Sequence, residues 1–124
     1  MRFARIVFWA AGLWGMLVLI PLYFMYDFVG RQDPPPLNHP QFYYGFAGAG
    51  LAWQFAFMVV GSDPVRFRPM MIPSLIEKFG FVLTLGVLVL TKQLEPQQFA
   101  IAVPDALLGC LFAMAFVKTR QANS

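Results

Sequence analysis

Apolar residues fill four long stretches of the chain, and the polar and charged residues are concentrated between them. The stretches span residues 6–26, 43–60, 73–91 and 96–117. A helix that crosses the hydrocarbon core of a bilayer needs about 20 residues, with a range of about 17–25. Each stretch therefore predicts one transmembrane helix, and the pattern predicts an all-α, polytopic membrane protein.

Small and polar residues share one helical face in each of the last three stretches. Helices in lipid associate through close packing of small residues and a few polar contacts. Residues three or four positions apart lie on the same face of a helix. The pattern therefore predicts a single four-helix transmembrane bundle over residues 1–124, with its polar groups facing one another. The polar members of these faces include Gln54, Glu77 and Asp105.

Composition supports the same class and excludes several chemistries. Only 12% of the 124 residues are charged and 59% are hydrophobic, whereas soluble domains carry about 25% charged residues. A single cysteine, Cys110, allows no intrachain disulfide, and a single histidine, His39, cannot supply both axial ligands of a haem. We therefore predict no metal site and no cofactor.

The basic residues predict the topology. The net charge is +3, but Lys and Arg lie mostly beside the apolar stretches, which indicates membrane orientation and not nucleic-acid binding. The more basic side faces the cytoplasm, so both termini are predicted to lie inside a bacterial inner membrane. One side carries Arg2, Arg5, Arg66, Arg68, Lys78, Lys118 and Arg120, and the other carries Arg31 and Lys92.

Two segments outside the helices carry further expectations. The first apolar stretch is longer than the roughly 7–15 apolar residues of a secretory signal and lacks a small-x-small cleavage site, so we expect it to remain as a membrane span. The loop 29–41 contains three consecutive prolines, which favour a stiff polyproline II spacer on the outer side.

Asp105 is the most unusual residue inside an apolar stretch. A central aspartate costs about 2.5–3.5 kcal/mol on insertion scales, and Pro104 before it predicts a kink or a helix break. One interpretation is structural: Asp105 caps a shorter helix or bonds to Gln54, which we expect at a similar depth. The other is a site for a ligand, a proton or an ion.

Tyrosines gather at the predicted outer interface, where Tyr43 and Tyr44 open the second stretch. They fit an aromatic belt. Alternatively, they form the walls of a pocket that opens outward above Asp105 and Gln54 and takes a lipophilic ligand.

On the opposite side, Arg66 and Arg68 are predicted to lie at the level of lipid phosphates. Lys78 is expected to extend to the same interface. Glu77, a possible second carboxylate, is expected to pair with Arg66 or Arg68. On this placement Glu77 and Asp105 lie in opposite halves of the membrane.

The runs HPQFYYGFAGAGLAWQFAF (39–57) and DPVRFRPMMIPSLIEKFGF (63–81) resemble small bacterial four-span membrane proteins. The size and number of spans are similar to those of the DoxX-like group. The resemblance implies a four-helix membrane domain and brings no catalytic residue with it.

Three functions remain compatible with the sequence. No nucleophile–base pair, metal cluster or phosphate-binding loop is evident, which favours a non-catalytic accessory subunit or a binder of a lipophilic small molecule. A second hypothesis is an oligomeric small transporter or channel, with the glycine-rich first and second spans at the interface between copies. A third is an intramembrane enzyme that acts on a lipid or isoprenoid through Asp105 and Glu77. The expected partners are the lipid bilayer and either further copies or another membrane subunit.

Overall fold

The computed structural model describes residues 2–32 and 39–123, and all regular secondary structure in these ranges is helical. The proline-rich part of the predicted outer spacer, residues 33–38, lies outside the described residues. The α-helices are α1 (Arg2–Leu19), α2 (Tyr26–Gln32), α3 (Pro40–Ser62), α4 (Met71–Leu90) and α5 (Val103–Asn123). Three 3₁₀ segments extend or join them: η1 (Ile20–Phe24), η2 (Arg68–Met70) and η3 (Pro96–Ala102).

Four helical segments of the described chain are long and apolar enough to cross a membrane. This confirms the predicted all-α class and the number of spans. The spans are Arg2–Phe24, Pro40–Ser62, Arg68–Leu90 and Pro96–Arg120. The third begins several residues before the predicted start at residue 73, because η2 runs directly into α4. This earlier start places Glu77 and Lys78 deeper in the span than the sequence suggested.

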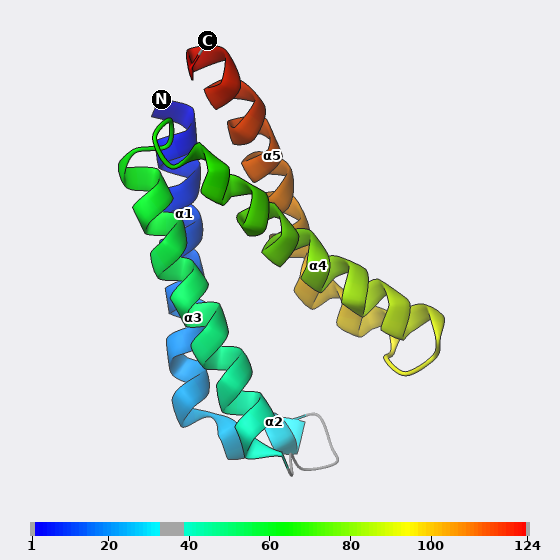
Figure 1. Ribbon diagram of the computed structural model, residues 1–124. Coiled ribbons are helices and arrows are strands. Elements are labelled where there is room, and N and C mark those ends of the chain that lie inside the picture. The colour runs from blue at the N-terminus through cyan, green and yellow to red at the C-terminus, as the bar shows by residue number, and fades with distance from the viewer. Residues whose placement is uncertain (1, 33–38, 124) are drawn as a thin grey trace.

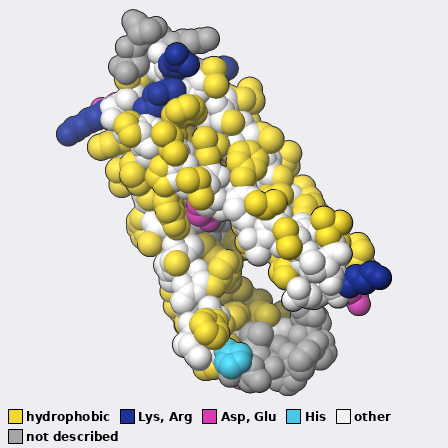
Figure 2. Space-filling model, turned by 45° about the vertical axis from the view of Figure 1, so that its right-hand side comes forward, with side chains coloured by type: hydrophobic (Ala, Val, Ile, Leu, Met, Phe, Trp, Pro, Cys, Tyr) yellow, Lys and Arg dark blue, Asp and Glu magenta, His cyan; other side chains and the backbone are white. Residues whose placement is uncertain are grey.

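The four spans form two antiparallel helical hairpins, one of α1 and α3 and one of α4 and α5 (Figure 1). The hairpins converge at the end that carries both termini, which we call the closed end, and diverge toward the opposite end (Figure 1). Helix α1 also packs along α5, whereas α3 and α4 touch only slightly. The space-filling view shows an opening between the two arms toward the diverging end (Figure 2).

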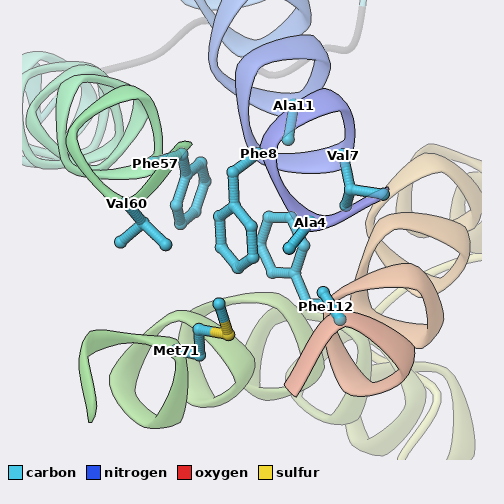
Figure 3. Packing of buried hydrophobic residues seen from close by; sticks show 9 residues of the cluster. Ala4, Val7, Phe8, Ala11, Phe57, Val60, Met71 and Phe112 are labelled. Atoms are coloured by element: carbon cyan, nitrogen blue, oxygen red, sulfur yellow. The ribbon is translucent and has the colours of Figure 1, made fainter. Parts of the chain in front are cut away.

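Aromatic packing holds the closed end together. Phe8 of α1 stacks on Phe112 of α5, with ring centroids 4.2 Å apart, and Phe57 of α3 packs edge-on against both rings. Met71 of α4 completes this fully buried cluster (Figure 3). The core thus joins all four spans at one end. Truncating one such phenylalanine to alanine typically costs about 3–5 kcal/mol.

Glycines allow α1 and α3 to approach closely. A Cβ atom on Gly12 would lie 2.8 Å from the backbone oxygen of Gln54, and one on Gly15 would overlap the Gln54 carboxamide. On α3, Gly61 faces Trp9 in the same way. These glycines therefore pack the hairpin itself, and their faces are covered within one chain instead of lying between copies.

The polypeptide does not break at Pro104. The 3₁₀ segment η3 passes directly into α5 at Val103, so the chain stays helical through the fourth span. Proline is favoured in the first turn of a helix, where its missing N–H has no partner to lose. Asp105 accordingly lies in the first turn of α5, and its side chain is directed to α4 instead of to a cap.

Candidate ligand-binding site

Glu77, Lys78 and Asp105 meet in the middle of the second hairpin, and we call them the Lys78 cluster. The Lys78 ammonium donates a hydrogen bond to Asp105 Oδ1 over 3.2 Å and lies 3.7 Å from Glu77 Oε2. Lys78 is ten residues after Arg68 and twelve before Leu90, which places it about 15 and 18 Å from the two ends of its span. The cluster therefore lies near the centre of the membrane-spanning region.

Local sequence explains why α5 can bring an aspartate to Lys78. Gly109, one turn after Asp105 on the same face, lies under the ring of Phe79, where a Cβ atom would come within 2.8 Å of the ring. Ala102, one turn before, is fully buried. These small residues let α4 and α5 approach closely enough for the short Asp105 side chain to reach across.

The cluster is strongly desolvated at its centre and less so at its acids. Lys78 is only 3% exposed, whereas the side chains of Glu77 and Asp105 retain 21% and 22% exposure. The Lys78 ammonium also lies 5.1 Å from the centre of the Phe57 ring, close enough for a cation–π interaction. Phe57 thus links the cluster directly to the aromatic core of the closed end.

Charge in the cluster is unbalanced. With both acids ionised, one ammonium faces two carboxylates, which gives a formal charge of −1. Glu77 Oε2 is buried and makes no hydrogen bond. In the described spans, no other charged residue lies between the terminal turns of the helices. Unpaired charge at this depth is costly, so the acids are suited to a further donor or cation.

Several sequence expectations for these residues were wrong. Lys78 does not extend to the interface, because it is buried and paired with Asp105. Glu77 pairs with Lys78 and not with an arginine. Glu77 and Asp105 do not lie in opposite halves of the membrane, since both approach the same ammonium nitrogen. The common cause is the early start of the third span at Arg68.

Arg68 is used within the protein. Its Nε donates hydrogen bonds to the Phe116 carbonyl oxygen over 3.0 Å and to Thr119 Oγ1 over 3.2 Å. Its guanidinium lies 3.7 Å from the centre of the Phe116 ring. Arg68 thereby ties the start of the third span to the last turns of α5. Arg66 is exposed at the same end, and a lipid-phosphate role for either arginine stays a prediction.

Gln54 belongs to the other hairpin and does not bond to Asp105. Its Nε2 donates a 2.8 Å hydrogen bond to the Gly50 carbonyl oxygen, one turn earlier on α3. Its Oε1 is buried against Gly15 of α1 without a hydrogen-bond partner. The prediction that Gln54 shares a face with small residues holds, but that face packs on α1, so the proposed Gln54–Asp105 bond is absent.

The tyrosines form a cluster at the diverging end of the first hairpin. Tyr43 and Tyr44 pack against Tyr23 and Tyr26, with ring centroids 5.0–5.9 Å apart. The Tyr43 hydroxyl donates a 2.6 Å hydrogen bond to the Leu22 carbonyl oxygen. Tyr43 precedes Gln54 by eleven residues, or about 16 Å along α3. The structure thus places these tyrosines in one group that is well separated from Gln54.

Lys78 is the cluster member that sequence reasoning assigned to the wrong place. A signal was present: it is the only basic residue inside an apolar stretch. A second unrecognised feature is the pair of Phe46 on α3 and Phe81 on α4, whose ring centroids are 6.4 Å apart. Phe81 follows Lys78 by three residues, so this aromatic contact between the hairpins lies one turn away from the cluster.

Two further findings concern metal binding and similarity to known proteins. Over residues 2–32 and 39–123, no three His, Cys, Asp or Glu side chains are grouped so as to hold a metal ion. No family model, curated protein or solved structure matches this chain.

Proposed function

We propose that this chain is a non-catalytic membrane protein that binds a lipophilic molecule between its two hairpins. The polar head of that molecule lies at Asp105 and Glu77, beside Lys78. The observation that carries the proposal is the Lys78 cluster itself: a buried ammonium with two partly open carboxylates near mid-membrane.

The cost of such a cluster supports a function. Removing a carboxylate or an ammonium from water costs several kcal/mol, and apolar residues of similar volume often pack at least as well. Ionisable side chains inside a span accordingly tend to mark ligand or ion sites. Acidic side chains are visible at mid-height on the molecule, surrounded by apolar surface, where the arms begin to part (Figure 2). This is the arrangement that an amphipathic ligand requires.

The pairing of the acids favours binding over catalysis. Asp105 accepts a hydrogen bond from the Lys78 ammonium, and Glu77 Oε2 lies 3.7 Å from the same nitrogen. A general base, in contrast, is positioned on a hydroxyl, thiol or substrate proton. Phe46 and Phe81 supply apolar surface beside the cluster for the tail of a ligand.

Native mass spectrometry of the protein released from lipid nanodiscs, without added ligand, tests the proposal. We expect a retained molecule that is not a bulk lipid, lost in Asp105→Asn. The matched control is Asp63→Asn, because Asp63 is an exposed acid at the closed end and its loss should leave the retained mass unchanged. A bare wild-type protein, or a mass that survives in both Asp105→Asn and Glu77→Gln, contradicts the proposal.

We also infer that both termini face the cytoplasm of a bacterial inner membrane, in a DoxX-like plan. Lys and Arg side chains gather at the closed end, and a further basic group lies at the tip of the α4–α5 hairpin (Figure 2). With Lys78 assigned to the middle of its span, the bias toward the closed end still stands. A reporter fused to the C-terminus and active only in the cytoplasm tests the orientation. Association with a second copy or another membrane subunit stays a prediction.

A further inference from the structure

We infer that the head group taken by the Lys78 cluster is a cation, so that the ligand is an amphipathic amine. The inference rests on the proposed function and adds the chemical class of the ligand. It follows from the charge balance of the site and from the positions of the other charged residues.

The balance of charge within the Lys78 cluster favours a second ammonium. Asp105 Oδ1 accepts a hydrogen bond from Lys78, but Glu77 Oε2 is 3.7 Å from the same nitrogen and accepts none. A ligand ammonium beside the exposed parts of the two acids brings two positive charges against two negative ones. A ligand carboxylate or phosphate, in contrast, adds a third negative charge at a depth where like charges are weakly screened.

No neighbouring element supplies the missing charge. The described part of α3 contains no charged residue, and α1 contains none after Arg5. Arg68 is about 15 Å from Lys78 along the third span and is already bonded to Phe116 and Thr119. On α5, Lys118 is thirteen residues after Asp105, or about 20 Å away. The negative charge of the two acids is therefore balanced only by Lys78 among these residues.

The surroundings suit an ammonium that carries an apolar tail. The Phe57 ring already faces the Lys78 ammonium, and Phe46 and Phe81 approach each other one turn along α4. Aromatic faces attract cations and also provide apolar contact. The acids are each about one-fifth exposed, with values of 21% and 22%, so a head group can approach them while the Lys78 nitrogen stays covered.

The experiment compares three probes of equal chain length: dodecylammonium, dodecanol and dodecanoate. Each is titrated at pH 7 into nanodiscs that contain the wild-type protein, and binding is measured by native mass spectrometry after subtraction of the uptake by empty nanodiscs. We expect dodecylammonium to bind at least about tenfold more tightly than dodecanol, a difference of about 1.4 kcal/mol, and dodecanoate to bind most weakly.

Two variants test whether the preference for dodecylammonium over dodecanol arises at the Lys78 cluster. Glu77→Gln should bring the affinity for dodecylammonium down to that for dodecanol, because it removes the excess negative charge. Glu95→Gln is the matched control, since Glu95 is an exposed acid in the turn before η3, and it should retain the preference. The wild-type comparison of the three probes needs no variant, so the inference stays testable even if Glu77→Gln folds poorly.

The outcomes separate the two proposals. Equal affinity for dodecylammonium and dodecanol overturns the amine inference and indicates that a proton already balances the cluster, with lipophilic binding intact. Tighter binding of dodecanoate overturns it as well, as does an amine preference that persists in a folded Glu77→Gln protein. Binding of none of the three probes contradicts the proposed function itself.

Discussion

Replacing Lys78 by methionine is expected to destabilise the protein strongly, because the ammonium is the shared partner of two carboxylates. Methionine keeps the length of the side chain and its apolar stem, so the packing against Phe57 changes little. What is lost is the 3.2 Å hydrogen bond to Asp105 and the charge beside Glu77. The two acids then remain in the span without a cation.

The size of the effect follows from burial. Removing one partner of a buried ion pair costs about 3–5 kcal/mol. Lys78 is 3% exposed, but the acid side chains are 22% and 21% exposed and keep some solvation. We therefore expect a loss of about 2–4 kcal/mol in the free energy of unfolding. In the double variant Lys78→Met/Asp105→Asn, the penalties should fall short of additivity by about 1–3 kcal/mol.

Equilibrium unfolding in bicelles, measured by steric trapping, gives these free energies. The control is Lys118→Met, because Lys118 is exposed and lies 4.1 Å from the centre of the Phe3 ring; such contacts are worth about 0.5–1 kcal/mol. If Lys78→Met costs no more than Lys118→Met, or if the Lys78 and Asp105 penalties simply add, the cluster is not held by its ammonium and the reasoning is refuted.

Four further substitutions test the packing and the helix ends by the same unfolding measurement. Gly12→Ala should lower the free energy of unfolding by about 1–3 kcal/mol, because its Cβ atom meets the Gln54 backbone oxygen. Its control, Gly80→Ala, has open space around the new Cβ atom and should leave the free energy of unfolding unchanged or raise it by up to about 1 kcal/mol. Equal effects of the two substitutions would argue against close α1–α3 packing. Arg68→Lys should lower the free energy of unfolding by about 1–2 kcal/mol and speed hydrogen exchange in the last turns of α5, because lysine cannot reproduce the Nε hydrogen bonds and the stacking on the Phe116 ring. Unchanged hydrogen exchange in these turns would contradict the role of Arg68. Lys92→Gly should raise the free energy of unfolding by about 1 kcal/mol, because Lys92 follows the C-cap residue of α4 and has a φ of 62°; a loss of stability would show that its side chain makes a compensating contact.

The sequence by itself determined the class of protein and the number of spans. Backbone groups in lipid must bond within their own helix, and the bilayer sets how many apolar residues a helix needs. Both constraints act along one segment at a time, so the apolar runs were sufficient to identify four spans. The small-residue face of Gln54 was also recognisable, because it depends only on helical spacing.

Only the tertiary structure decided which residues meet. The partner of Asp105 depends on how far α4 is rotated and shifted against α5, and an early start of the third span moved Lys78 from the interface to mid-membrane. Phe8, Phe57 and Phe112 come from three spans that are far apart in the chain. The divergence of the hairpins likewise depends on which helix faces touch. Contacts of this kind depend on the combined geometry of several helices, and apolar side chains in lipid are too alike for any single segment to specify its neighbour.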